Sequence, residues 1–224
     1  MEAQCGPLTT FPTLEALQRG HQDLRALLFD MDGTLLRTEE IHGEVLRRMA
    51  AGWRVRPPFP PEEVEDRLKG LSDAQVWEQA CSWENFPQDL TVEDFVAEKN
   101  RKILTLIPEL DPKLWSAREL RHLLREARGA GMARAVVTSS ERVVTDLLLS
   151  RAELTSEFDL VITLQDVKRP KPAPDPYLQA MVRLGVGPRE TLVFEDSPTG
   201  LAAARAAGGR VLAVDWWKGF SARG

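Results

Sequence analysis

Five short apolar runs, separated by segments with helical periodicity, constrain most strongly what this chain can fold into. The runs cover residues 24–29, 134–138, 159–163, 191–195 and 210–214. Each is bounded by turn or helix signals, which is typical of strands that are buried on both faces. The intervening helices are predicted over residues 116–130, 141–150, 175–184 and 198–207. This alternation predicts an α/β fold with an open parallel sheet and right-handed crossovers.

The segment from residue 38 to 111 interrupts this alternation, because its patterns are helical throughout. We predict helices over residues 39–51, 61–68, 73–83 and 92–106, separated by turns such as the proline-rich RPPFPP at 56–61. A small α-helical domain is therefore expected to be inserted after the first strand. The expected organisation is an N-terminal extension (1–23) with a short helix around 14–18, a core (24–37 and 112–224) and the helical insert (38–111).

Composition and charge exclude several classes of function. The 224 residues have a net charge of −5, whereas duplex binding depends on clustered Lys and Arg, so we expect no nucleic-acid partner. No apolar stretch approaches the roughly 20 residues that span a bilayer, and no signal peptide is apparent. Cys5 and Cys81 lack metal-ligand spacing and are expected to be free thiols in a reducing compartment. A cytoplasmic protein without a membrane partner is expected; the oligomeric state is left open.

Polar clusters follow three of the predicted strands and occupy one proline-rich loop. Their members are Asp30, Asp32, Thr138, Ser139, Ser140, Lys171, Glu195 and Asp196. Ligands of an open α/β sheet bind beyond the carboxyl ends of its strands, so these side chains are expected to converge. An Asp-x-Asp pair alone also fits an exposed, inert turn. Four clusters on one side of the same predicted sheet argue against that interpretation.

In order and in strand context, these clusters match the four motifs of the haloacid dehalogenase superfamily, which residues 24 to 215 resemble. The helical insert is similar to the small helical cap of that family. Segments 38–42 (TEEIH), 68–72 (LKGLS), 99–100 (KN) and 194–200 (FEDSPTG) resemble the β-phosphoglucomutase-like branch of sugar and polyol phosphatases. The resemblance implies a Rossmann-like core and a Mg²⁺-dependent phosphatase acting on a small phosphorylated metabolite.

The resemblance also implies catalytic roles. Asp30 would attack phosphorus and form an aspartyl-phosphate, while Lys171 and Thr138 would hold the phosphoryl oxygens. Asp32 would protonate the leaving oxygen and then activate the hydrolytic water. Dehalogenases proper lack that second aspartate, so Asp32 favours phosphate chemistry over cleavage of a carbon–halogen bond.

A magnesium site is implied at the same strand ends, because Mg²⁺ prefers carboxylate, carbonyl and water oxygens. Its ligands are expected to be Asp30, the backbone carbonyl of Asp32, and Asp196. Glu195 is expected in the coordination shell or just behind it.

Seven further residues are expected to contact the substrate: Ser139, Ser140, His42, Lys69, Lys99, Asn100 and Arg142. The residues alone leave alternatives open. Lys69 and Lys99 also fit long side chains that lie along a helix surface. For His42, the resemblance implies a substrate or gating role, which the sequence leaves undecided. Trp216 and Trp217 are expected in the core or at an interface, which leaves a sheet edge and a dimer contact both open.

Two positions favour a phosphatase over a sugar-phosphate mutase. Asp73 follows residues 70–72 (GLS), where mutases that resemble this chain carry an arginine that can bind a second phosphate. Glu141 and Arg142 replace the Lys-Asn pair that follows the second motif in those mutases. A catalytically silent binding protein is a further alternative, but such proteins usually lose a motif carboxylate or the lysine, and every one is present here.

Overall fold

The computed structural model describes residues 7–68, 71–111 and 118–217. The chain forms two compact units, of which one comprises Met1–Arg37 with Asp111–Gly224 and the other Thr38–Leu110. We refer to them as the α/β unit and the helical unit. Lys69, one of the expected substrate contacts, lies outside the described residues, as do the first residues of the helix predicted over 116–130.

The α/β unit contains a five-stranded parallel sheet, which confirms the open parallel sheet predicted from the apolar runs, and the structure gives its strand order as β3-β2-β1-β4-β5. The strands are β1 (Ala26–Phe29), β2 (Ala133–Val137), β3 (Leu160–Ile162), β4 (Thr191–Glu195) and β5 (Arg210–Ala213). β4 has the predicted bounds, and the other strands differ from prediction by one or two residues at an end. Strand ends are less certain in a sequence because the last paired residue depends on the neighbouring strand.

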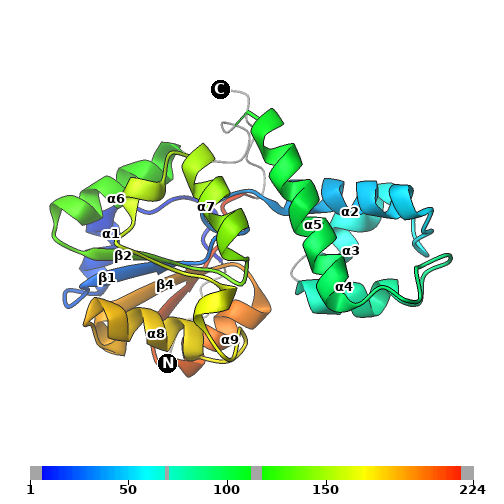
Figure 1. Cartoon of the computed structure of the whole chain (residues 1–224). Coiled ribbons are helices and arrows are strands. Elements are labelled where there is room, and N and C mark those ends of the chain that lie inside the picture. The colour runs from blue at the N-terminus through cyan, green and yellow to red at the C-terminus, as the bar shows by residue number, and fades with distance from the viewer. Residues whose placement is uncertain (1–6, 69–70, 112–117, 218–224) are drawn as a thin grey trace. The chain divides into compact units, whose positions relative to one another are not determined.

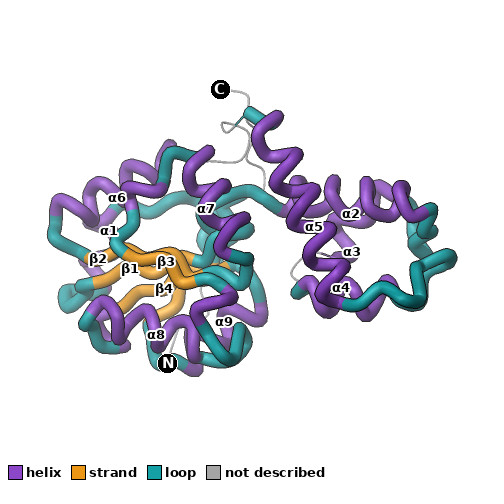
Figure 2. Tube along the Cα trace, viewed as in Figure 1, coloured by secondary structure: helices purple, strands orange, loops and turns teal. Residues whose placement is uncertain are grey.

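Helices cover both faces of this sheet. They are α1 (Leu14–Gly20), α6 (Arg118–Gly129), α7 (Arg142–Arg151), α8 (Asp175–Leu184) and α9 (Pro198–Ala206), with short 3₁₀ turns η4 (Thr155–Glu157), η5 (Leu164–Asp166) and η6 (Pro188–Glu190). Figures 1 and 2 show α8 and α9 on one face and α1, α6 and α7 on the other. This two-sided cover explains why the strands are apolar along their whole length.

The two faces of the sheet have different cores. Leu28 belongs to a cluster with Tyr177 and Met181 of α8 and small residues of α9. Successive strand residues point to opposite faces, so Phe29 joins the other core. There it stacks on Phe194, with ring centroids 4.6 Å apart. We call Phe158, Phe29, Phe194 and Trp216, each in ring contact with the next, the aromatic row.

The described part of the N-terminal extension is built into the α/β unit. The Leu8 N–H donates to the Ala213 carbonyl at 2.8 Å, and the Asp215 N–H donates to the Leu8 carbonyl at 2.7 Å. Helix α1 packs beside α6, where the Leu14 N–H donates to Glu126 at 3.2 Å. The extension therefore pairs with the chain at the end of β5, on the outer edge of the sheet.

The helical unit contains the four helical segments predicted from the sequence. Its elements are α2 (Glu39–Trp53), η1 (Pro61–Glu63), α3 (Val64–Leu68), α4 (Asp73–Ala80), α5 (Val92–Leu106) and η2 (Ile107–Glu109). The helix predicted over 73–83 was too long, because turn-type bonds such as Trp83 N–H to Ala80 O replace the α pattern after Ala80. Ser72 and Gln75 form the capping box that begins α4.

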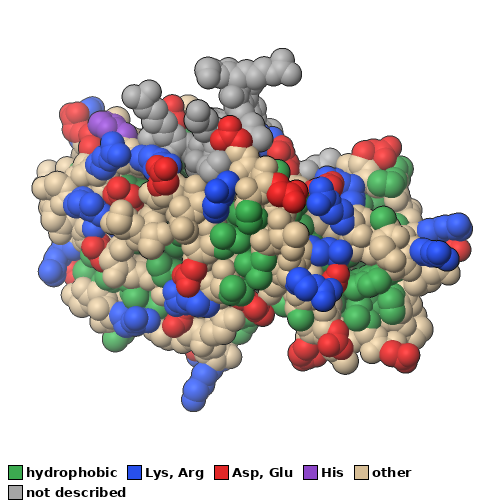
Figure 3. Space-filling model, turned by 45° about the horizontal axis from the view of Figure 1, so that its top comes forward, with side chains coloured by type: hydrophobic (Ala, Val, Ile, Leu, Met, Phe, Trp, Pro, Cys, Tyr) green, Lys and Arg blue, Asp and Glu red, His purple; other side chains and the backbone are tan. Residues whose placement is uncertain are grey.

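The charge distribution on the surface and the apolar character of the helices relate to the expected absence of nucleic-acid and membrane partners. On the face seen in Figure 3, acidic and basic side chains are interspersed, without an extended patch of one sign among the side chains described. None of the helices within the described residues has the length and apolar character needed to cross a membrane.

A partly buried ion pair joins the start of β2 to the start of β3. Arg134, whose side chain is 5% exposed, donates from Nη2 to Asp159 Oδ1 at 2.7 Å, and its backbone N–H donates to Oδ2 at 2.8 Å. Partial burial by itself would raise the pKa of Asp159. The hydrogen bonds from Arg134 outweigh it and hold that pKa below its usual value.

We predict that Asp159→Asn lowers the free energy of unfolding by about 1–3 kcal/mol at pH 7, between typical values for exposed and buried ion pairs. A carboxyl group with a lowered folded-state pKa stabilises the fold above its unfolded pKa, and this contribution disappears as the pH falls through the folded pKa. The difference from wild type should therefore shrink below a pH of about 4. Denaturant unfolding of both proteins at several pH values measures this difference in unfolding free energy.

The exposed pair Arg19–Glu15 supplies the control, since Glu15 is 78% exposed. Glu15→Gln should change the unfolding free energy by less than about 0.5 kcal/mol at any pH. A pH-independent loss in Asp159→Asn would contradict the electrostatic explanation.

Candidate active site

The carboxyl ends of β1, β2 and β4 lie side by side because β1 pairs with both of the other strands. Phe29, the last residue of β1, is level with Val136 of β2 and Phe194 of β4. The next residue, Asp30, donates its backbone N–H to the Phe194 carbonyl at 3.0 Å. Pairing therefore carries Asp30 to the crevice where β1 separates the two halves of the sheet, the usual ligand position in such folds.

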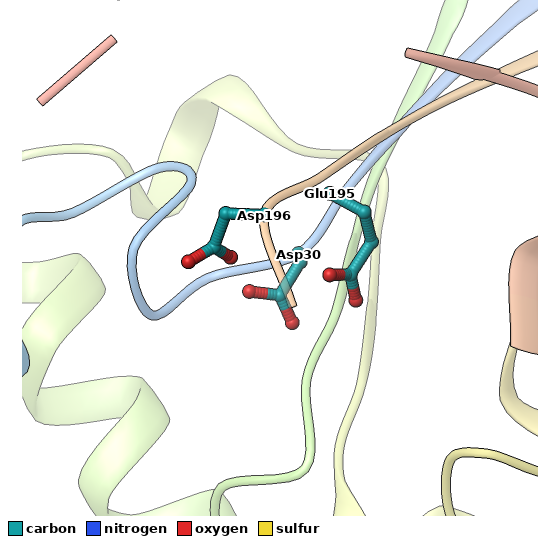
Figure 4. Close-up of side chains that lie close together, drawn as sticks. All are labelled: Asp30, Glu195 and Asp196. Carbon is teal, nitrogen blue, oxygen red and sulfur yellow. The ribbon is translucent and has the colours of Figure 1, made fainter. Parts of the chain in front are cut away.

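Three carboxyl groups meet at this crevice. One oxygen from each of Asp30, Glu195 and Asp196 lies within 4.8 Å of the others. Figure 4 shows the Asp30 side chain between those of Glu195 and Asp196, with Asp30 coming from the end of β1 and the other two from the end of β4. Asp30 is 7% exposed and Glu195 is fully buried. Burying this much negative charge is costly unless cations compensate it.

Lys171 supplies one such cation. Its Nζ donates to Asp30 Oδ1 and Glu195 Oε1, both at 2.6 Å, and to the Val137 carbonyl at 2.9 Å, which uses all three ammonium protons. Burial by itself would lower the pKa of Lys171. The negative charges of Asp30 and Glu195 outweigh it and raise that pKa well above its usual value, so the ammonium stays protonated.

Glu195 is fully engaged by protein donors. Its Oε1 accepts from Lys171 and from the Tyr177 hydroxyl at 2.9 Å, and its Oε2 accepts from the N–H and hydroxyl of Ser197, both at 3.0 Å. A side chain at Gly200 would overlap the Glu195 carboxyl group. These contacts place Glu195 as the anchor of Lys171, behind the two aspartates.

Negative charge remains in excess at the crevice. Burial raises the pKa of Asp30 well above its usual value, Glu195, Asp196 and Asp32 raise it further, and Lys171 opposes them. The carboxylates outnumber the one ammonium, so a divalent cation held by hard oxygen ligands fits this site electrostatically. Asp30 and Asp196 are the residues best placed to hold it, since their oxygens are grouped and Glu195 is occupied.

Asp32 lies at the second side of the crevice, toward the end of β2. It is half-buried and accepts a hydrogen bond from the Ser140 hydroxyl at 2.7 Å. The Ser140 N–H in turn donates to the Thr138 hydroxyl at 3.0 Å. Ser139, between them, is exposed. The structure thus brings the expected Asp32, Thr138 and Ser140 together.

Four other expected substrate contacts are among the described residues. The Arg142 guanidinium donates to Asp166 at 2.6 Å and to the Val161 carbonyl at 3.1 Å. The carboxylate of Asp166, just after β3, therefore compensates its charge. His42, Lys99 and Asn100 belong to the helical unit, and their role toward a substrate stays a prediction.

Tyr177 and Gly200 are site residues that the sequence analysis did not single out. Gly200 lies inside the FEDSPTG segment that carries the family resemblance, so its motif was an available signal. Tyr177, the one tyrosine of the chain, gave no such signal, because its contact with Glu195 depends on how α8 packs on the sheet.

Comparison with known proteins finds relatives that match most of the chain. Residues 27–214 match the model of the haloacid dehalogenase-like hydrolases. The chain is 31% identical to protein CbbY of Rhodobacter capsulatus over 196 residues, which cover 85% of each chain. It is also 31% identical to fructose-1-phosphate phosphatase YqaB of Escherichia coli over 191 residues, which cover 81% of this chain and 92% of the relative.

Solved structures agree with these matches. CbbY of Rhodobacter sphaeroides, in complex with xylulose-(1,5)bisphosphate, superimposes with a TM-score of 0.73 at 27% identity, covering 84% of both chains. A putative β-phosphoglucomutase of Thermotoga maritima gives a TM-score of 0.65 at 28% identity, again covering 84% of both chains. The parallel sheet, the acidic strand ends and these matches together show that the chain is an enzyme of the haloacid dehalogenase-like hydrolase family.

Proposed function

We propose that this protein is a Mg²⁺-dependent phosphatase that hydrolyses a small sugar or polyol phosphate through an aspartyl-phosphate on Asp30. The observation that carries the proposal is the buried carboxyl of Asp30, held by Lys171 and flanked by Asp196 and Glu195. The names of relatives support the substrate class. They include fructose-1-phosphate phosphatase of Escherichia coli, (DL)-glycerol-3-phosphatase 1 of Arabidopsis thaliana and a phosphorylated carbohydrates phosphatase of Thermotoga maritima.

The metal ligands in this proposal are Asp30, Asp196 and the backbone carbonyl of Asp32, with Glu195 behind them. When bound, Mg²⁺ would supply positive charge that lets an anionic phosphate approach an anionic carboxylate. Lys171 adds a fixed positive charge beside the nucleophile, and its bond to Glu195 keeps it there.

In the proposed reaction, Asp30 is the nucleophile and Asp32 transfers the protons. An Asp30 oxygen bonds to phosphorus while the bond from phosphorus to the ester oxygen breaks, and Asp32 gives that oxygen its proton. Asp32, now ionised, takes a proton from water, which attacks phosphorus and releases inorganic phosphate and free Asp30. The Ser140 hydroxyl donates to Asp32 and orients it for both transfers. Thr138 lies at the adjacent strand end, where its hydroxyl is suited to a phosphoryl oxygen.

An ion pair inside the helical unit favours hydrolysis over the mutase reaction. Asp73 occupies the position where similar mutases carry an arginine, and it accepts a hydrogen bond from the Lys99 ammonium. The side chain of Lys99 is 9% exposed, so water screens this ion pair little, and Asp73 largely neutralises the charge of Lys99. A mutase must hold a second phosphate of its bisphosphate intermediate, and a neutralised lysine binds a dianion far less well than a free arginine.

We predict that the wild-type protein releases inorganic phosphate from sugar or polyol phosphates, and that a metal chelator abolishes the reaction. Asp30→Asn should remove turnover, because an amide is a poor nucleophile. Asp32→Asn should lower kcat by about 10²–10⁴-fold through lost proton transfer. Phosphate release across a metabolite panel, with and without Mg²⁺, measures all three effects. Asp89→Asn, at an exposed position of the helical unit, is the matched control. Wild-type turnover in Asp30→Asn would refute the mechanism.

We predict that Gly200→Ala impairs catalysis through Glu195. The new methyl group overlaps the Glu195 carboxyl group, which must move and loosen Lys171. Overpacking of this kind costs about 1–3 kcal/mol of stability. Misplacement of site groups by about 1 Å can lower turnover by about 100-fold. Gly129→Ala is the control, since its added methyl group meets nothing within 4 Å apart from its chain neighbours and the nearby backbone of its own helix. Full activity in Gly200→Ala would show that the position of Glu195 is unimportant.

We predict hydrolysis without mutase activity when the enzyme is given β-glucose 1-phosphate and a trace of β-glucose 1,6-bisphosphate. Any sugar phosphate that is consumed should appear as free sugar with an equal amount of inorganic phosphate, because no second phosphate is retained. Chromatography of the sugars with a phosphate assay follows the balance. Accumulation of glucose 6-phosphate without matching phosphate release would instead identify a mutase.

A further inference from the structure

Thr34, a fully buried residue in the loop after β1, connects two parts of the α/β unit. Its hydroxyl donates to Asp196 Oδ1 at 3.0 Å. Its carbonyl accepts from the indole Nε1 of Trp216 at 2.7 Å and from that of Trp217 at 3.1 Å. Two donors use both lone pairs of one carbonyl oxygen, so Thr34 is held through its backbone as well as through its hydroxyl.

The loop around Thr34 closes on itself through its own backbone. The Gly33 N–H donates to the Leu36 carbonyl at 2.8 Å, and the Leu36 N–H donates to the Met31 carbonyl at 3.0 Å. Gly33 has φ 79°, a conformation that glycine adopts without strain. These bonds fix the conformation of the loop. The position of Thr34 relative to Asp196 depends in addition on contacts with residues outside the loop, which include Trp216 and Trp217.

The two tryptophans are themselves held by the N-terminal segment. The Phe11 ring stacks on Trp216, with centroids 4.5 Å apart, and meets Trp217 edge-on at 5.8 Å. Trp216 also contacts Phe194, the residue before Glu195, at 5.8 Å. Trp216 and Trp217 are 2% and 7% exposed. The indole N–H groups are thus aimed at one carbonyl by packing that involves both ends of the chain.

We propose that Trp216 and Trp217 are positioning residues for the metal-binding carboxylate Asp196. They fix Thr34, and the Thr34 hydroxyl fixes the Asp196 carboxylate in the orientation that binds Mg²⁺. This inference rests on the proposed function for the identity of the ion. Removal of an indole N–H leaves the Thr34 carbonyl with one donor fewer and loosens the orientation of Asp196.

Replacing each tryptophan by phenylalanine separates positioning from packing, because phenylalanine keeps an aromatic ring and lacks the N–H group. Trp216→Phe and Trp217→Phe should each weaken Mg²⁺ binding by about 2–10-fold, the usual effect of one hydrogen bond, and the double variant should weaken it more. Thr34→Val removes the hydroxyl at nearly constant volume and should weaken binding similarly. Titration calorimetry with Mg²⁺ alone, without substrate, gives the dissociation constants, and thermal unfolding without Mg²⁺ confirms that each variant is folded.

Trp53→Phe is the matched control, since Trp53 packs against Phe86 and Phe95 inside the helical unit. It should bind Mg²⁺ as the wild type does. For the Trp216 and Trp217 variants, the Mg²⁺ concentration needed for half-maximal phosphate release should rise, while KM for substrate at saturating Mg²⁺ stays within about twofold of wild type.

The possible outcomes decide between this inference and the proposed function. If the double variant and Thr34→Val bind Mg²⁺ with wild-type affinity, or if Trp53→Phe weakens binding equally, positioning by the tryptophans is refuted. If the wild type binds Mg²⁺ and only the Trp216, Trp217 and Thr34 variants lose affinity, the inference holds even when no phosphate ester is hydrolysed. A wild type that binds no Mg²⁺ overturns both.

Discussion

The buried ammonium of Lys171 is the contact on which the rest of the site depends. Asp30 and Glu195 come from neighbouring strand ends, and without a cation between them their mutual repulsion and burial would favour the protonated forms. The sheet and the helices of one face contribute to this arrangement. Lys171 precedes α8, Tyr177 belongs to α8, and Ser197 begins α9, so both helices of one face anchor the carboxylates that two strands present.

The sheet register is the second constraint. Phe29 and Phe194 are level in the ladder and stack on the face opposite to α8 and α9, and the residues after them carry the acidic side chains. A slip of one residue would turn every side chain of a strand to the other face, which would move Phe29 out of the aromatic row and Asp30 out of line with Glu195 and Asp196. The aromatic row therefore helps to fix the alignment of the acidic strand ends as well as the packing of the sheet.

Ion pairs compensate the charge of two residues that the sequence analysis expected to contact a substrate. Arg142 is held by Asp166, and Lys99 is held by Asp73, so two cations with suitable chemistry have their charge compensated within their own units. Asp32, Thr138 and Ser140 instead form a connected group at the crevice.

Local patterns in the sequence were sufficient to determine the parallel sheet, the inserted helices and the residues at the strand ends. Apolar runs mark buried strands, and polar residues directly after them must lie at one edge of the sheet, whatever the packing. Only the tertiary structure decided that Glu195 is saturated by Tyr177, Lys171 and Ser197, and that Arg142 is engaged by Asp166. It also brought the Trp216 indole to the Thr34 carbonyl, 182 residues away in the chain. Such contacts depend on side-chain direction and helix packing between distant segments, which no local pattern encodes.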